Sequence, residues 1–290
     1  TRDVPRNEAP IPAGDSEMNR LRLTSAFQWV GLSNAPNIQT LSYDAHILER
    51  SGVGGVIYVD RNGNTSQIGG QLSFAHHLTI NSANAQYISF GLSYKFTQFK
   101  IDVSDFENPN DDPNIGANVS SHNSNFDAAF LYKLEGFYFS FNANNILEKK
   151  IDDIRVAEPS LLLNYQIYSG YVFNGPGKSN LEFEPSVYYQ MFSSDKRSST
   201  DLNFKVRKYN RNEDYYWAGI SYRFLNDQFF KPLNVGPMVG FKKSLFYFGY
   251  AYQVTINDLS SYNSGTHVIT IGLDFLRGIS NCPCTQSPVH

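Results

Sequence analysis

Cysteine, charge and long apolar runs are all scarce in this sequence of 290 residues. The longest aliphatic run covers residues 161–163, whereas a membrane-spanning helix needs roughly 20 predominantly apolar residues, so no such helix is predicted. Cys282 and Cys284 flank Pro283, and two thiols alone are too few for a closed zinc site. We expect a tail without a catalytic role there. A strained local disulfide or a metal shared with His290 is the alternative.

Charged residues make up only 18% of the chain, against about 25% in an average soluble domain. The 24 basic and 27 acidic residues give a formal net charge of −3, without the basic excess typical of nucleic-acid binding. Aromatic residues reach 15%, with 22 Phe and 19 Tyr but 2 Trp. Ser, Asn, Gln and Tyr take the place of the missing charges. This balance is expected of a sheet with one apolar face and one wet, uncharged face.

Strict alternation of apolar and small or polar residues is the main pattern of the sequence. Residues 87–97 read YISFGLSYKFT, so the apolar side chains occupy every second position. Successive side chains of a strand point to opposite faces, and this segment is therefore predicted to be a strand with one apolar face. Phe90, Leu92 and Tyr94 lie on that face.

Similar segments recur along the whole chain and are long for strands. We predict about 14 of them, and polar residues on both faces make the second and the tenth the weakest. Their expected bounds are 20–30, 38–49, 53–60, 66–78, 86–98, 125–134, 137–146, 159–172, 181–192, 199–209, 214–224, 232–242, 245–256 and 265–276.

The connections between these segments differ in length in a regular way. Links after even-numbered segments are mostly short, as at 135–136, and links after odd-numbered segments are mostly long, as at 99–124; the link at 172–180 is longer than this trend. Long strands, alternating faces and unequal links are typical of an outer-membrane β-barrel. We therefore predict a transmembrane antiparallel barrel with its apolar face toward lipid. A large soluble β-sandwich or a lipocalin-like barrel is the alternative.

Four pieces of the sequence resemble one family of such barrels. Together they resemble the PorP/SprF family of type IX secretion and gliding-motility proteins of the Bacteroidetes outer membrane. The pieces are FQWVGL at 27–32, similar to an early "R-x-Q-W" segment; VGGVI at 53–57 with DRNG at 60–63, similar to the second hairpin; FAHHL at 74–78, similar to "Y-A-Y-H-L"; and GTHVI at 265–269 with the terminal Cys-Pro, similar to "G-T-H-E-I" and the family's ending.

The sequence departs from the family pattern in two places. Residues 5–15 replace the usual Asn-Pro-rich N-terminal stretch, and Val268 stands where a glutamate is common. The alternating segments predict a barrel over residues 20–277, between a polar segment at 1–19 and a tail at 278–290. The resemblance implies that this barrel binds or anchors secreted adhesins through their C-terminal sorting domain, together with other secretion and gliding components and membrane lipids. A passive porin or small-molecule transporter is the competing interpretation.

Histidines are the first candidates for chemistry. His76, His77 and His267 would suit a lipid-modifying enzyme only beside a nucleophile, and the sequence has no G-x-S-x-G elbow. We therefore expect no catalytic residue, cofactor or metal ion. The alternation instead places His77, Lys95 and Arg223 on the polar face, where we expect them to join hydrogen bonds inside the barrel.

An acidic link is the candidate for partner binding. The long link after residue 98 lies outside the cell if the short links lie in the periplasm, and recognition usually resides in loops on a rigid scaffold. Its spacing does not match a calcium-binding EF-hand. The expected partner-binding residues are Asp105, Glu107, Asn110, Asp111 and Asp112.

Overall fold

A computed structural model shows an all-strand chain. It describes residues 18–31, 34–48, 50–102, 119–147, 162–175, 180–210, 214–257, 260 and 264–277. That part of the chain holds no helix long and apolar enough to span a membrane. The strands are β1 (Met18–Phe27), β2 (Asn37–Leu48), β3 (Ser51–Asn62), β4 (Thr65–Asn81), β5 (Gln86–Ile101), β6 (Val119–Leu134), β7 (Phe137–Asn144), β8 (Asn164–Tyr171), β9 (Phe173–Asn174), β10 (Leu181–Phe192), β11 (Ser198–Tyr209), β12 (Tyr215–Leu225), β13 (Lys231–Lys243), β14 (Phe246–Thr255) and β15 (Thr266–Arg277).

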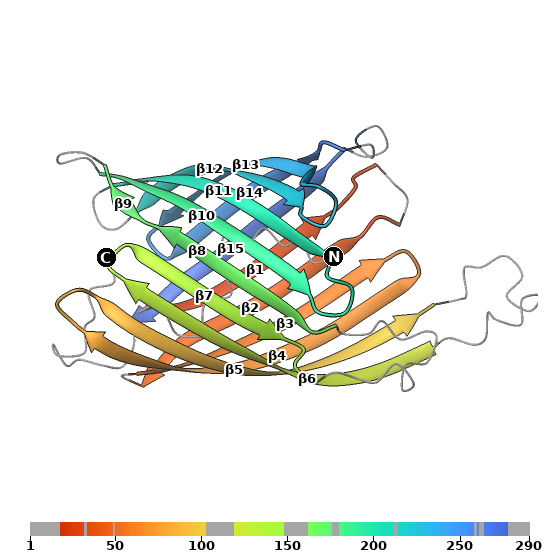
Figure 1. The fold of residues 1–290 in the computed structure, drawn as a ribbon, viewed down its shortest axis with the longest axis horizontal. Coiled ribbons are helices and arrows are strands. Elements are labelled where there is room, and N and C mark those ends of the chain that lie inside the picture. The colour runs from red at the N-terminus through yellow and green to blue at the C-terminus, as the bar shows by residue number, and fades with distance from the viewer. Residues whose placement is uncertain are drawn as a thin grey trace, which may run out of the picture.

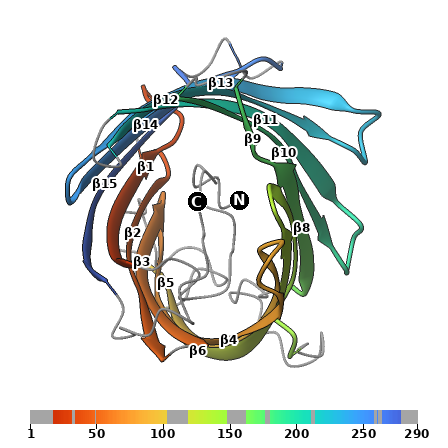
Figure 2. The same cartoon turned by 90° about the vertical axis from the view of Figure 1, so that its left-hand side faces the viewer.

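These strands form one closed antiparallel barrel (Figures 1 and 2). Each strand pairs with its sequence neighbour, and β15 pairs with β1 to close the wall. The two-residue β9 follows β8 after Val172 and pairs with the same strand, β10, so β8 and β9 share one position. The barrel therefore has 14 strand positions, which confirms the predicted fold. Closure gives every strand two neighbours and leaves no free sheet edge running the length of the wall.

Links of different length gather at opposite ends of the barrel. One end, here called the short-link end, carries the links at 49–50, 82–85, 135–136, 175–180, 210–214 and 244–245. Met18 pairs with Arg277, so β1 begins and β15 ends at this end too. The opposite, long-link end carries the links at 28–36, 63–64, 102–118, 145–163, 193–197, 226–230 and 256–265. The two-residue turn at 63–64 is an exception there, and Gly63 gives it the positive φ (57°) that such a turn needs.

Strand pairing extends β6 by six residues before its expected start, whereas β7 and β8 are shorter than expected. β6 begins at Val119 rather than at residue 125, because its ladder with β5 continues to the pair of Ile101 and Val119. Residues 120–124 are all polar, so hydrophobic alternation gives no signal there. β8 begins at Asn164 rather than at 159, and β7 ends at Asn144 rather than at 146.

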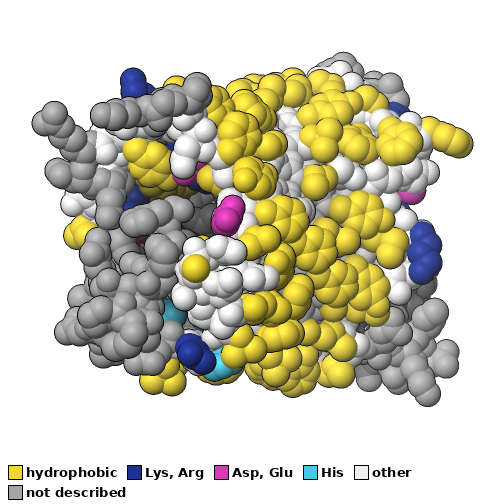
Figure 3. Space-filling model, turned by 60° about the vertical axis from the view of Figure 1, so that its left-hand side comes forward, with side chains coloured by type: hydrophobic (Ala, Val, Ile, Leu, Met, Phe, Trp, Pro, Cys, Tyr) yellow, Lys and Arg dark blue, Asp and Glu magenta, His cyan; other side chains and the backbone are white. Residues whose placement is uncertain are grey.

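The outward face carries most of the large apolar side chains. Phe90, Leu92 and Tyr94 are 52%, 57% and 44% exposed, as expected for side chains that point away from the interior. Figure 3 shows apolar side chains forming a broad band across the outer surface. Such a band is the surface that a membrane barrel presents to lipid.

Aromatic rings lie flat against glycines on the interior wall. A Cβ atom added at Gly69 would lie 2.4 Å from the ring of Tyr58, and one at Gly240 would lie 2.6 Å from the ring of Trp217 and 2.4 Å from the carbonyl oxygen of Phe248. Glycine at these positions leaves room for the ring of the neighbouring strand.

Candidate functional site: the interior network and the open edge of β6

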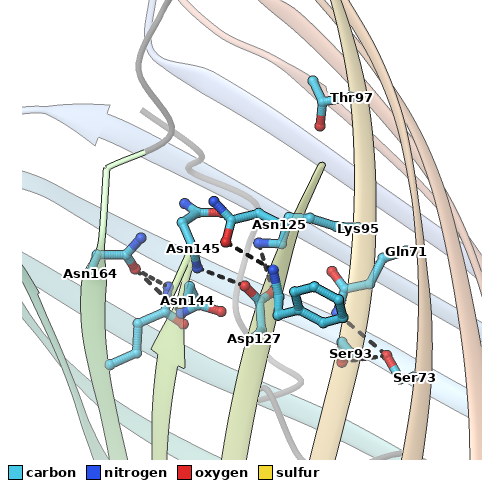
Figure 4. A network of polar contacts seen from close by, with 12 residues as sticks. Gln71, Ser73, Ser93, Lys95, Thr97, Asn125, Asp127, Asn144, Asn145 and Asn164 are labelled. Atoms are coloured by element: carbon cyan, nitrogen blue, oxygen red, sulfur yellow. Dashed lines mark hydrogen bonds and ion pairs between the residues drawn. The ribbon is translucent and has the colours of Figure 1, made fainter. Parts of the chain in front are cut away.

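A buried ion pair joins β5 and β6 inside the barrel. The ammonium nitrogen of Lys95 lies 2.6 Å from Oδ2 of Asp127, and 4% and 9% of the two side chains are exposed. The Oδ1 atom of Asp127 accepts the backbone N–H of Asn145 at 2.8 Å (Figure 4). A buried charge needs a partner and satisfied hydrogen bonds, and each charge here has the other close by.

Asn125 attaches the chain that leaves β7 to β6. Its Oδ1 accepts the backbone N–H of Leu147 at 2.9 Å, and its Nδ2 donates to the carbonyl of Leu147 at 3.1 Å. The chain changes direction at Asn145, whose φ of 59° is one that asparagine tolerates better than most residues. The start of the 145–163 link is therefore held beside β6.

The other end of that link is held by side-chain amides. Asn145 and Asn164 both donate to the carbonyl of Leu162 at 3.1 Å. The Oδ1 atom of Asn164 also accepts from Asn144, Gln166 and Gln190, at 3.0–3.3 Å. We call Lys95, Asn125, Asp127, Asn145 and Asn164 the interior network. It fixes both ends of the 145–163 link against the wall.

The long-link part of β6 lacks a paired strand on one side. β7 pairs with β6 only from Ala128 to Leu134, whereas β5 pairs with it up to Val119. Beyond Ala128, one main-chain bond continues the ladder, from the N–H of Ile146 to the carbonyl of Phe126 at 2.9 Å. Among the described residues no strand pairs with residues 119–125 on this side. We call this stretch the open edge of β6 (Figure 1).

Charged side chains inside the short-link end also pair across strands. Arg22 lies 2.5 Å from Asp274, Lys205 lies 2.9 Å from Glu184, and Arg207 pairs with Glu184 as well. The ion pairs connect neighbouring strands, β1 with β15 and β10 with β11. Tyr138 of β7 donates to Glu184 of β10 at 2.9 Å and so spans the intervening β8. These contacts brace the wall from the inside.

The three residues expected on the polar face all lie inside the barrel wall. Lys95 joins the interior network, and Arg223 of β12 donates two bonds of 2.5 Å to Asp201 of β11. Nδ1 of His77 lies 2.7 Å from the hydroxyl of Ser89. Each of the three therefore contacts a polar side chain of an adjacent strand.

The other two histidines lie elsewhere. His76 points outward and its Nδ1 lies 3.1 Å from the hydroxyl of Ser51, while His267 lies beside Tyr250 at 2.8 Å. The structure therefore does not bring the three histidines together. In the part of the chain that it describes, no group of three or more His, Cys, Asp or Glu side chains is placed to hold a metal ion.

The acidic partner-binding candidates Asp105, Glu107, Asn110, Asp111 and Asp112 lie outside the described residues, as do Cys282 and Cys284.

Comparison with known families decides what kind of barrel this is. The family described as "Type IX secretion system membrane protein PorP/SprF" matches residues 9–273. The chain belongs to the PorP/SprF family. It is a type IX secretion barrel of the outer membrane, and its apolar outer band is the lipid-facing surface. No curated protein matches the sequence.

Two solved structures similar to this PorP/SprF barrel are both transport proteins by name, and the CymD likeness agrees with the barrel fold. The CymD monoaromatic hydrocarbon channel is 12% identical with a TM-score of 0.52, and the match covers 91% of this chain and 89% of CymD. The toluene transporter TbuX of Ralstonia pickettii is 11% identical with a TM-score of 0.49, covering 89% of both chains. At 12% identity the likeness to CymD concerns the barrel fold alone.

Val268 belongs to a small apolar cluster inside this PorP/SprF barrel. It is 1% exposed and packs with Ala26 and Ile38. The family resemblance implies a glutamate at this position. The valine closes an apolar contact between β15, β1 and β2. No carboxylate therefore stands at this point of the interior.

Of the interior network, the sequence pattern predicts only Lys95 as an interior residue. Asn125 and Asp127 share one face of an alternating strand with the buried Leu131, and this shared face is the sequence signal that indicates their interior position. Nothing local in the sequence indicates that their partners lie in the next link.

Proposed function

We propose that this PorP/SprF barrel binds an exported adhesin through the adhesin's C-terminal sorting domain and holds it at the long-link end. The barrel acts as a scaffold, without bond chemistry and without a cofactor. Other components of the secretion and gliding machinery contact the same barrel, and membrane lipids cover its outer band. The long-link end faces the outside of the cell in this arrangement.

The interior network is the observation that carries this proposal. Lys95 and Asp127 form an ion pair within the wall, and Asp127 and Asn125 accept hydrogen bonds from the start of the 145–163 link. These bonds give the long-link end a firm base on which two long links, at 102–118 and 145–163, are mounted. Recognition sites usually combine such a rigid base with long loops. We assign the 102–118 link, with Asp105, Glu107, Asn110, Asp111 and Asp112, to the partner contact.

Capture of a sorting domain is the decisive experiment. A barrel extracted in mild detergent should co-purify with an exported protein that carries an intact C-terminal sorting domain, and not with the same protein lacking that domain. Deleting residues 107–116 should reduce capture while the barrel still folds. Unchanged capture by that deletion variant would remove the partner role of the 102–118 link.

Two other roles give different results. A porin would show stable single-channel steps in planar bilayers and would capture no sorting domain. A lipid-modifying enzyme would hydrolyse phospholipid, and the activity would disappear in His77→Ala or His267→Ala. Either result, together with failed capture, would replace the proposed scaffold role.

A further inference from the structure

We propose that the exported partner adds an extended strand of its own to the open edge of β6. This inference rests on the proposed function, and it names where and how the partner's backbone is recognised. The recognised chemistry is a main-chain ladder, formed by the N–H and C=O groups of a partner strand with those of Ser120, His122 and Ser124. Strand addition to an exposed sheet edge is a general mode of peptide recognition.

The direction of the main-chain groups at the edge follows from one main-chain hydrogen bond. In a strand the N–H and C=O of a residue point to the same side, and successive residues alternate between sides. The carbonyl of Phe126 accepts from Ile146, so Phe126 faces the side of β7. Ser120, His122 and Ser124 have the same parity and present their main-chain groups to that side. Residues 121, 123 and 125 instead face β5.

The open edge stands beyond the lipid-facing band. The outward side chains of this part of β6 belong to Ser120, His122 and Ser124, and all three are exposed and polar. Phe126 is the first outward apolar residue toward the middle of the strand, at 38% exposure. Unpaired main-chain groups are not tolerated in hydrocarbon, whereas in water they are available to another chain. Within the described ranges no strand covers this edge, and its surroundings are aqueous.

The protein's own chain already begins the proposed ladder. Ile146 adds one main-chain bond to β6, and Asn125 holds Leu147 beside it with two side-chain bonds. Next to this point, the side-chain oxygens of Asn123 and Asn145 are buried without a hydrogen-bond partner. Buried polar atoms are normally satisfied, so these two oxygens mark the place where a donor is missing. A strand continuing from the position of Ile146 would bring donors there.

The occupant is an extended polypeptide segment rather than a small molecule. Three edge residues offer alternating donors and acceptors along one line, which only another backbone can match. The outward positions of β5 and β6 beside the edge include Lys100 and no carboxylate, so a segment with acidic or hydroxyl side chains suits them. The edge also directly follows the 102–118 link assigned to partner binding, so one partner can contact both.

Proline substitution tests the main chain separately from the side chain. His122→Pro removes an N–H that faces the open edge and leaves the ladder to β5 intact, a position where proline is tolerated. His122→Ala keeps that N–H and removes only the imidazole. Ser121→Pro removes an N–H that faces β5 and serves as the control for damage to the wall. Folding of each variant is followed by the heat-dependent shift of its migration on gels.

The binding probe is a purified C-terminal sorting domain from a protein exported by the same organism, fused to a fluorescent protein. It is titrated against the full barrel in detergent micelles. We expect His122→Pro to fold and to weaken binding by about tenfold or more, because it loses a main-chain hydrogen bond and blocks close approach. We expect His122→Ala to change binding less than about threefold, and Ser121→Pro to impair folding.

Three results would overturn the inference while the proposed function stands. Binding by His122→Pro equal to that of the wild type would exclude the edge. An equal loss in His122→Ala would assign recognition to the side chain. Cross-linking of Ser124→Cys barrels to one another, rather than to a cysteine-bearing sorting domain, would assign the edge to a second copy of this chain. Failure of the wild-type barrel to bind the probe would instead refute the proposed function itself.

Discussion

Asp127 accepts from two parts of the chain at once: the ammonium of Lys95 lies 2.6 Å from one oxygen, and the backbone N–H of Asn145 lies 2.8 Å from the other. One carboxylate thereby connects β5, β6 and the link that follows β7. The pair is almost fully enclosed, so its loss should affect both the stability of the wall and the geometry of the long-link end.

Breaking this ion pair should destabilise the barrel strongly. Lys95→Met leaves the Asp127 carboxylate buried without its cation, which costs about 3–5 kcal/mol in comparable buried pairs. Urea unfolding of the barrel refolded into lipid vesicles measures the change in the free energy of unfolding. The exposed pair of Arg197 and Asp195 is the control, since Arg197→Met should cost less than about 1 kcal/mol. Equal effects of the two substitutions would contradict the structural importance of the buried pair.

Removing the clamp on Leu147 should weaken partner capture as well as stability. Asn125→Ala deletes both side-chain bonds to Leu147, so the 145–163 link loses its attachment to β6. We expect a loss of about 1–3 kcal/mol in unfolding free energy and reduced binding of the sorting-domain probe. Gln71→Ala, which removes one long bond to Ser73 (3.4 Å), should change neither appreciably. If Asn125→Ala binds the probe like the wild type, the link is not part of the partner surface.

Gly240→Ala should destabilise the barrel, because the added methyl group has no room. A Cβ atom there would lie 2.6 Å from the ring of Trp217 and 2.4 Å from a backbone oxygen, so Gly240→Ala must shift the wall of β13 and β14. We expect a destabilisation of about 1–3 kcal/mol. Gly55→Ala is the matched control, because its nearest neighbours lie at 3.9 Å and 4.0 Å. The comparison fails if the two alanine variants unfold at the same urea concentration.

The lipid-facing surface should reject charge in its middle and tolerate it at the long-link end. Leu72 is 70% exposed near the centre of β4, and Leu72→Arg should cost about 2–4 kcal/mol in a bilayer. Ser120→Arg, outward and close to the tip of β6, should cost no more than about 1 kcal/mol. Vesicle-based unfolding provides both values. A cost for Ser120→Arg as large as that for Leu72→Arg would place the open edge of β6 within the lipid and so contradict its exposure to a partner.

Sequence alternation was sufficient to predict the strands and their two faces. All 14 expected segments are strands, including the weakly patterned ones now described as β2 and β11, because period-two alternation follows directly from strand geometry. The interior orientation of Lys95 and Arg223 comes from the same parity. Bounds were less accurate where residues 120–124 are polar throughout, since pairing with β5 rather than burial holds that part of β6 in place.

The partners of those interior residues depended on the tertiary structure. Lys95 meets Asp127 and Arg223 meets Asp201 because of the registers between neighbouring strands, and no local pattern specifies a register. The turn at Asn145 and the early end of β7 likewise depend on bonds from Asn125 and Asp127 on another strand. The sequence by itself determined an alternating, lipid-compatible wall, since each residue's face depends only on its position in its own strand. Only the closed barrel decided the interior network and the open edge of β6, because both arise from contacts between residues distant in sequence.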